Sequence, residues 1–293
     1  MRYGTVLTAL CLAVLPHRLA AQATDTPPVD KKPVAKAAAD TGKYALITNK
    51  DLYYTAGFAV VTVGVGVLLD RSVAEGLQDT AKLPSVLVTN TARTFNFIGM
   101  PGAFIVPVAL YAVGRVGGLQ SLADAGLHTM EAVLVTEGLT YVAKVGFGRQ
   151  RPYYAGTDHP GDFGLGAGFK GNAFSSFPSG HASGAFALAS ALTAEISSRR
   201  PSLVKFIAPP LFLGASMVAW ARLQSNKHWL SDVFMGAGLG TIIGIKTVRF
   251  NHKHPHGLVD RLLLAAHPAV IPRGDGSAAV ALAWSVPSPL SRW

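Results

Sequence analysis

The sequence predicts an all-α protein: a helical bundle of about six core helices, followed by a short C-terminal tail that resembles a β-hairpin. Two observations favour this fold. Apolar residues make up 49% of the 293 residues and charged residues only 14%, whereas an ordinary soluble domain is about 25% charged. The apolar residues are gathered in long runs rich in alanine, glycine, valine and leucine. Such runs are typical of helices that lie in a protein core or in lipid.

The N-terminal segment predicts an exported chain. Residues 1–23 carry Arg2 ahead of the apolar segment TVLTALCLAVL and end in the small residues AQA, which is the pattern of a signal peptide. An uncleaved anchor is the alternative. Residues 24–45 are polar and contain prolines, so we expect a flexible linker. The single cysteine, Cys11, lies inside the signal, and the mature chain therefore has no thiol for disulfides or catalysis.

Residues 46–258 are expected to form one helical domain. Its core helices are expected in the apolar runs 52–69, 94–114, 126–146, 181–197, 203–222 and 229–248. Segment 76–93 is compatible with a further, amphipathic helix. The small residues in these runs allow close helix packing, as in membrane bundles. Several runs are shorter than the roughly 20 residues that a bilayer requires, so a soluble bundle stays open as an alternative.

Two other segments have distinct patterns. Residues 153–177 contain six glycines between two helical runs, which indicates either a lid or binding loop, or a surface loop. The tail is assigned to residues 259–293. Within it, residues 269–286 predict two short strands around a Gly-Asp-Gly turn.

The chain is strongly basic, with a formal net charge of +10. Such an excess is typical of proteins that bind nucleic acid, anionic lipid or phosphate-bearing substrates. Nucleic acid is disfavoured because the basic residues form no polar stripe and no reader motif is present. The sequence has no HExxH motif, cysteine cluster or acidic cage, so we expect no metal ion and no cofactor.

Three polar clusters interrupt the apolar runs. They comprise Lys144 with Arg151-Pro152, then Pro178-Ser179-Gly180-His181, then Arg222 with His228 and Asp232. Each alone fits a solvated helix end, a turn with an N-cap, or a structural His–Asp pair. However, the clusters lie at the ends of successive helical runs. An up-and-down bundle would therefore bring all three to the same end.

The combined side chains fit a tetrahedral phosphate. Arg151 and Arg222 can each donate two parallel N–H bonds to its oxygens, and Lys144 adds a point charge. Gly180 allows backbone N–H groups at the start of the following helix to approach the anion, and Ser179 can donate its hydroxyl. Together these groups would stabilise the added charge of a five-coordinate transition state.

The two histidines can divide the chemistry. His228 and Asp232 are four residues apart on one helical face. The carboxylate can fix the imidazole tautomer and leave the other ring nitrogen free to attack phosphorus. His181 would then protonate the leaving oxygen and later activate water against the phosphohistidine. The remaining histidines, including His128, His159 and those of HKHPH at 252–256, are expected at the surface.

These three motifs, in this order and at these spacings, resemble the signature of the type 2 phosphatidic acid phosphatase (PAP2) and vanadium haloperoxidase superfamily. The resemblance runs from Lys144 to the helix after Asp232. It implies an all-α bundle with His228 as nucleophile and His181 as acid. It also implies phosphate ligands at Lys144, Arg151, Ser179, Gly180 and Arg222. The third motif commonly begins Ser-Arg, whereas Ala221 precedes Arg222 here, which removes one hydroxyl.

The resemblance implies a metal-independent phosphatase that hydrolyses a phosphate monoester or pyrophosphate, with a lipid-linked substrate favoured over a small soluble ester. Three alternatives stay open. The same site could hold vanadate and oxidise halide, with His228 ligating vanadium. The chain could be a soluble periplasmic non-specific acid phosphatase. It could also be a non-catalytic membrane scaffold. The exact substrate and the oligomeric state do not follow from the sequence.

Two features of the sequence disagree about which side of the membrane the site faces. Positive charges at 197–205 and 246–256 lie opposite the three clusters, so that end would face the cytoplasm and the site the periplasm. If a cleaved signal leaves the mature N-terminus outside, three crossings before the first cluster would place the site inside. The conflict disappears if 76–93 also crosses, if one run does not cross, or if the bundle is soluble. Glu131 and Glu137 within the third run favour a protein-buried helix.

Overall fold

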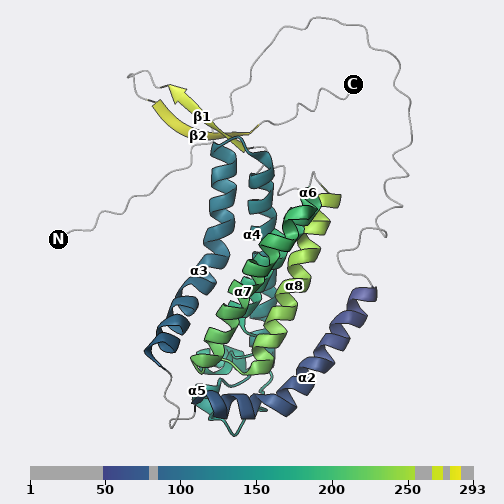
Figure 1. Ribbon diagram of the computed structural model, residues 1–293, viewed down its shortest axis with the longest axis vertical. Helices are drawn as coiled ribbons and strands as arrows, with labels where there is room; N and C mark the ends of the chain where they lie inside the picture. Colours follow the sequence, from purple (N-terminus) through teal and green to yellow (C-terminus); the bar gives the residue numbers. More distant parts are fainter. Residues whose placement is uncertain (1–48, 79–84, 255–265, 273–277, 285–293) are drawn as a thin grey trace, which may run out of the picture. The chain divides into compact units, whose positions relative to one another are not determined.

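The computed structural model describes residues 49–78, 85–254, 266–272 and 278–284 (Figure 1). Within these residues, six long helices carry the fold: α2 (Asn49–Gln78), α3 (Val86–Val116), α4 (Gln120–Phe147), α6 (Gly180–Arg199), α7 (Pro201–Gln224) and α8 (Leu230–Lys253). The predicted all-α helical bundle is therefore confirmed. The expected signal peptide at 1–23 and linker at 24–45 lie outside the described residues.

The helices are longer than the apolar runs that predict them. The first run stops before Asp70, yet α2 continues to Gln78, because Asp70 is fully buried against polar partners and does not meet solvent. The separate helix expected at 76–93 is wrong. Residues 76–78 end α2, and residues 86–93 begin α3. Ser85 caps α3, since its hydroxyl accepts a hydrogen bond from the Val88 N–H at 3.3 Å.

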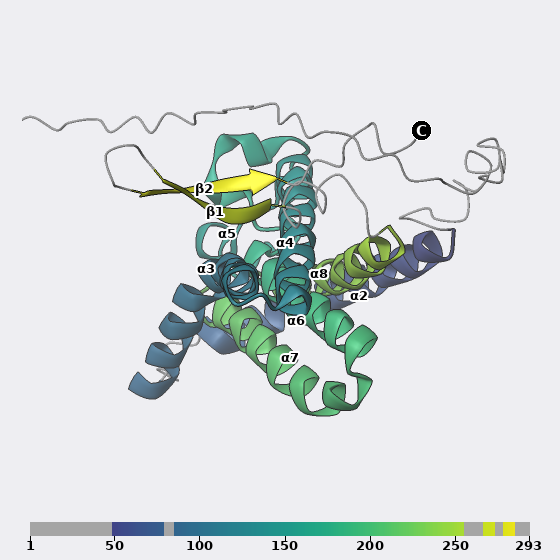
Figure 2. The ribbon, with the colours of Figure 1, turned by 90° about the horizontal axis from the view of Figure 1, so that it is seen from above.

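Helix α6 lies among the other helices, and it contacts α8, α7, α4 and α3 (Figure 2). Small residues make its close packing against α8 possible. A Cβ atom at Gly240 of α8 would lie only 2.2 Å from the Ser183 carbonyl oxygen of α6. Since no side chain fits there, the two backbones approach closely, as small-residue interfaces allow in membrane bundles.

Four of the described helices are long and apolar enough to cross a membrane: α2 from Tyr53, α3, α7 and α8. Large apolar side chains project from them without covering, such as Val67 (80% exposed) and Ile105 (63% exposed). Exposed apolar surface of this extent is unfavourable in water and marks a membrane or protein interface. The structure thus supports membrane association.

The helix ends lie in two groups (Figure 1). The site end contains the ends of α4 and α7 and the starts of α6 and α8, and the basic end contains the end of α6 and the start of α4. At the site end, Asn96 near the start of α3 accepts a hydrogen bond from Arg222 near the end of α7. At the basic end, Arg199 at the end of α6 pairs with Asp124 near the start of α4. Helix α2 runs toward the site end and α3 runs away from it. A further crossing between them at 76–93 is therefore excluded as a resolution of the topological conflict.

The basic end contains a buried histidine, contrary to the expectation that His128 lies at the surface. Its Nδ1 lies 2.5 Å from Glu195 Oε1, and His252 Nε2 lies 2.9 Å from the same oxygen. A carboxylate that is only 1% exposed requires such partners, because an unpaired buried charge is costly. His252 and His254 are half-buried, and His159 is exposed as expected.

Near the C-terminus, β1 (Ala266–Pro272) pairs antiparallel with β2 (Ala278–Trp284). Ala266 lies opposite Trp284, and Pro272 lies opposite Ala278. Two short strands were expected within 269–286, so the first strand begins slightly earlier than predicted. The expected turn residues between the strands lie outside the described residues.

Candidate active site

The site end brings six of the predicted residues to one cavity of about 210 Å³: Lys144, Arg151, Gly180, His181, Arg222 and His228. This cavity is called the phosphate cavity below. Lys144 and Arg222 lie in the last turns of α4 and α7, and His181 lies in the first turn of α6. The alternating helix directions therefore bring residues from distant parts of the sequence together. The other two predicted residues, Ser179 and Asp232, are fully buried and do not line the cavity.

His228 is almost completely buried, and its two ring nitrogens have different surroundings. Nδ1 lies 2.8 Å from the Ser176 carbonyl oxygen, and Nε2 lies 3.4 Å from Arg151 Nη1. A carbonyl only accepts hydrogen bonds, so Nδ1 carries the proton and Nε2 keeps its lone pair. Burial, with the charges of Lys144 and Arg151, holds the pKa of His228 well below its ordinary value of 6.5. The imidazole is therefore neutral near pH 7.

Asp232 was predicted to fix His228 directly, but the structure places another acceptor closer. Its Oδ2 lies 3.6 Å from His228 Nδ1, outside hydrogen-bond distance. That oxygen accepts hydrogen bonds from the Ser176 hydroxyl at 2.5 Å and the Trp229 N–H at 2.8 Å. Asp232 thus holds the segment containing Ser176, whose carbonyl in turn orients the imidazole. Sequence reasoning missed Ser176 because a backbone acceptor has no side-chain signature.

Arg149 is a second residue that the motifs did not identify, and it is only 3% exposed. Its Nη1 donates to Asp232 Oδ1 at 2.6 Å and to the Ser231 hydroxyl at 2.7 Å. Its Nη2 donates to Asp70 Oδ2 at 2.7 Å. Asp70 also accepts from the Ser231 N–H at 2.8 Å. This buried network joins α2, the segment after α4, and the start of α8.

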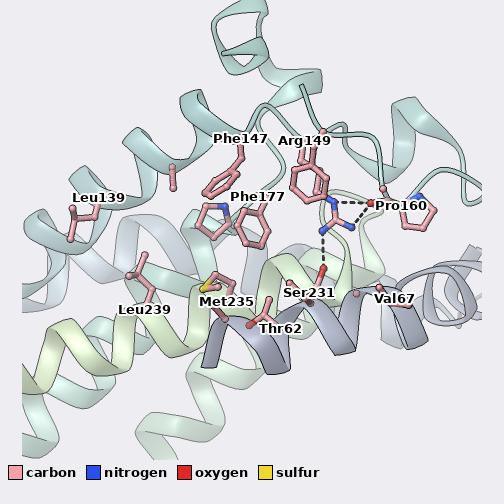
Figure 3. A pocket seen from close by; sticks show the side chains of 17 residues that line it. Thr62, Val67, Leu139, Phe147, Arg149, Pro160, Phe177, Ser231, Met235 and Leu239 are labelled. Atoms are coloured by element: carbon pink, nitrogen blue, oxygen red, sulfur yellow. Dashed lines mark hydrogen bonds between the residues drawn. The ribbon is translucent and has the colours of Figure 1, made fainter. Parts of the chain in front are cut away.

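Arg149 lies beside an apolar cavity of about 640 Å³ and not in the phosphate cavity. Figure 3 shows its hydrogen bonds to Pro160 and Ser231, with Phe147 and Phe177 lining the same cavity. The two cavities share no lining residue. Two arginines separated by one residue therefore have different roles: Arg149 is structural, and Arg151 lines the phosphate cavity.

The three cations of the phosphate cavity are held by neutral groups. Lys144 Nζ donates to the Pro178 and Ser175 carbonyls at 2.6 and 2.8 Å. The Arg151 guanidinium donates to the Asn172 and Lys227 carbonyls at 2.7 and 3.0 Å, and burial lowers its pKa. Arg222 Nη1 donates to the Asn96 side-chain oxygen at 2.7 Å.

No ion pair among the described residues involves these three cations. Gathering three such side chains in a partly buried cavity is unfavourable, and burial together with the charge of Arg151 lowers the pKa of Lys144 to about 7. A bound anion would offset this cost. The arrangement is therefore suited to bind an anion.

Several buried polar atoms in or beside the cavity also lack a hydrogen-bond partner within the described part of the chain. They are Ser179 Oγ, Arg222 Nε, Glu137 Oε1 and Thr140 Oγ1. Buried polar groups in proteins nearly always have partners, so these atoms have capacity to bind water or a ligand. Ser179 and Arg222 were predicted to bind phosphate. Glu137 and Thr140 were not predicted to have this role, although both line the cavity.

Comparison with known proteins agrees with this arrangement. Residues 125–255 match the family model described as PAP2 superfamily. The lipid A 1-phosphatase of Porphyromonas gingivalis is 33% identical over 107 residues, which cover 36% of this chain. The chain spans only 19% of the length of that relative.

A solved structure shows the same fold. The transmembrane PAP2 type phosphatidylglycerolphosphate phosphatase from Bacillus subtilis superimposes with a TM-score of 0.51 and 17% sequence identity. The match covers 69% of this chain and 96% of that protein.

Proposed function

We propose, from the match of residues 125–255 to the PAP2 superfamily model, that the protein is a membrane-associated phosphatase that hydrolyses a lipid-linked phosphate monoester or pyrophosphate. One observation carries the proposal. Three cations without a carboxylate partner among the described residues surround a cavity that also contains a neutral histidine. Phosphate supplies the missing negative charge, and the histidine supplies a nucleophile.

We assign the nucleophile to Nε2 of His228. The Ser176 carbonyl accepts the Nδ1 proton, so the Nε2 lone pair is available to form a bond to phosphorus. Burial and the nearby cations lower the pKa of His181 to about 4, and the negative charge of a bound phosphate would oppose this effect and favour the protonated imidazole. As the bond from His228 forms, the bond between phosphorus and the leaving oxygen breaks, and His181 gives its proton to that oxygen. His181 then takes a proton from water, which attacks phosphorus and releases His228.

The remaining groups of the site stabilise the negative charge on the phosphoryl oxygens. Lys144, Arg151 and Arg222 contact these oxygens in the proposed complex, with the N–H groups at the start of α6. The hydroxyl of Ser179, which precedes α6 and has no partner among the described residues, can turn toward them. Because fixed cations supply the electrostatic stabilisation, we propose that the reaction proceeds without a metal ion or cofactor.

A lipid substrate is favoured by the exterior of the bundle. Apolar side chains cover helices that are long enough to cross a membrane, so a lipid phosphate could reach the cavity from the bilayer. The curated relative and the solved structure are both named as phosphatases of lipids. We therefore propose a phosphorylated lipid as the substrate class and place the protein in the cell membrane.

We further propose that the site faces the periplasm, because the basic end carries Arg199, Arg200, Lys205, Lys246, Arg249 and Lys253. Helices α2, α3 and α4 separate the start of α2 from the site. A periplasmic site combined with an exported, cleaved N-terminus then requires that one of these three helices does not cross the membrane. If all three helices cross the membrane, α2 begins on the cytoplasmic side.

The purified full chain in detergent micelles tests the proposed function. We expect it to release inorganic phosphate from 1-oleoyl-glycerol 3-phosphate in mixed micelles, with no loss of rate in a chelator. Orthovanadate should inhibit competitively, since it carries the same tetrahedral charge as phosphate. Oxidation of bromide by peroxide after vanadate loading would instead support the haloperoxidase alternative. Failure to hydrolyse any phosphorylated lipid or soluble ester would support a non-catalytic scaffold.

The pH dependence follows from the lowered pKa of His228. The nucleophile is active when neutral, so activity is present above the lowered pKa and is lost as the pH falls through it. A histidine of ordinary pKa 6.5 would be neutral in only about a quarter of the molecules at pH 6. We expect kcat/KM, corrected for substrate ionisation, to fall less than about 1.5-fold between pH 7 and pH 6, whereas a nucleophile of pKa 6.5 would lower it about threefold. An acid limb centred at pH 6.5 or above would contradict the assignment.

A further inference from the structure

Glu137 is an unexpected residue in a cavity suited to bind an anion. It lies two turns before Lys144 on α4 and lines the phosphate cavity together with Lys144 and His181. Burial raises the pKa of Glu137 to about 7, against the lowering effect of Lys144. In its ionised form the carboxylate only accepts hydrogen bonds, so it cannot donate to phosphate oxygens and repels them instead. The phosphate chemistry proposed above therefore gives no reason for Glu137.

Two glycines of α6 make room for this carboxylate. A Cβ atom at Gly184 would lie 2.9 Å from Glu137 Oε1, and one at Gly180 would lie 3.2 Å from Oε2. These glycines are four residues apart and thus share one face of α6. The first turns of α6 therefore lie close to the Glu137 carboxylate.

The carboxylate has capacity for a further donor. Glu137 Oε1 has no hydrogen-bond partner among the described residues, and neither does Thr140 Oγ1, which is 1% exposed. The two residues are three apart on α4, so their side chains are neighbours on one face. The nearest cation on the helix, Lys144, directs its ammonium to the Pro178 and Ser175 carbonyls. An acceptor and a hydroxyl therefore remain available beside the phosphate ligands.

The cavity has room for more than a phosphate group. Its volume of about 210 Å³ equals roughly seven water molecules at ~30 Å³ each, whereas a phosphate has five heavy atoms. Part of the leaving group would thus occupy the same cavity. Among its lining residues, Met100 and Tyr141 supply apolar surface, and Glu137 and Thr140 supply the polar surface not already assigned to phosphate.

We propose that Glu137 and Thr140 form a subsite for a hydrogen-bond donor on the leaving group, close to the scissile phosphate. This inference rests on the proposed phosphatase function and narrows its substrate class. The substrate is a lipid phosphate whose head group carries a hydroxyl or amide N–H near the phosphate, such as a polyol or an amino sugar. Without such a donor, the substrate leaves the carboxylate unpaired and is rejected.

A matched pair of substrates tests the subsite. The first is 1-oleoyl-glycerol 3-phosphate, which has a free hydroxyl beside the phosphate-bearing carbon. The second is its 2-deoxy analogue, and both are presented to the full chain in the same mixed micelles. We expect kcat/KM to favour the hydroxyl-bearing substrate by about 10- to 100-fold, because hydrogen bonds to charged groups are among the stronger ones. A ratio close to one would overturn the proposal.

Variants then assign the discrimination to the carboxylate. In Glu137→Ala the ratio should fall toward one, chiefly because kcat/KM of the hydroxyl-bearing substrate decreases. Glu137→Gln keeps one acceptor oxygen and should retain part of the ratio. Glu131→Gln is the matched control on the same helix, because Glu131 accepts a hydrogen bond from Asn251 at the basic end. It should leave the ratio unchanged.

A merely structural role gives a different result. If Glu137 only balanced positive charge or packed against α6, its variants would lower kcat/KM for both substrates in parallel and leave the ratio as in the wild type. That outcome would overturn the subsite and leave the phosphatase function intact. If the wild-type chain turned over neither this pair nor any other phosphate ester, the proposed function itself would fail.

Discussion

His228→Ala is expected to lower kcat for lipid phosphate by about 10⁴-fold or more. The variant lacks the nitrogen that forms the covalent bond to phosphorus, and His181, the other histidine that lines the phosphate cavity, is assigned to proton transfer. The three cations remain, so substrate and vanadate should still bind. Phosphate release under single-turnover conditions measures the loss, and equilibrium binding of vanadate shows that the site persists.

The control for this variant is His159→Ala, since His159 is exposed on the loop after α5 (Pro152–Ala155). It should retain wild-type turnover and the same thermal unfolding temperature. Rapid quench in alkaline detergent with ³²P-labelled substrate should trap an acid-labile, base-stable phosphoenzyme in the wild type and in His159→Ala, but not in His228→Ala. Turnover of His228→Ala within tenfold of the wild type would rule out the phosphohistidine route.

Sequence order predicted how the phosphate cavity is assembled. Lys144, His181 and Arg222 each lie at a helix boundary, and helices that alternate in direction place successive boundaries at one end. The apolar runs indicated these boundaries to within a few residues, because the polar residues of the motifs interrupt them. This local information was sufficient to bring distant residues together.

The supporting network could not be predicted in the same way. Arg149 and Arg151 flank one glutamine, and nothing in their spacing distinguishes a structural arginine from a phosphate ligand. The partner Asp70 precedes Arg149 by 79 residues, at the end of an apolar run where a charge usually indicates solvent. Ser176 orients His228 through its backbone. These roles depend on tertiary contacts between α2, the loop and α8, for which a single sequence gives no signal.

Arg149→Met is expected to destabilise the fold by about 3–5 kcal/mol, the usual cost of removing one partner from a buried ion pair. The substitution leaves the carboxylates of Asp70 and Asp232 buried, with only hydroxyl and N–H donors. Since Asp232 also holds Ser176, the orientation of His228 should be lost as well. Thermal unfolding in detergent, followed by tryptophan fluorescence, should show a clearly lower midpoint.

Arg151→Met provides the matched comparison, because it removes the same charge only two residues away. Arg151 donates to carbonyl oxygens and has no carboxylate partner among the described residues. Its loss relieves repulsion with the neighbouring cations, so the unfolding midpoint should stay close to that of the wild type, or rise, while phosphate release is largely lost. Vanadate should raise the midpoint of the wild type and have less effect on Arg151→Met. If both variants lowered the midpoint equally, the division between a structural and a phosphate-binding arginine would be wrong.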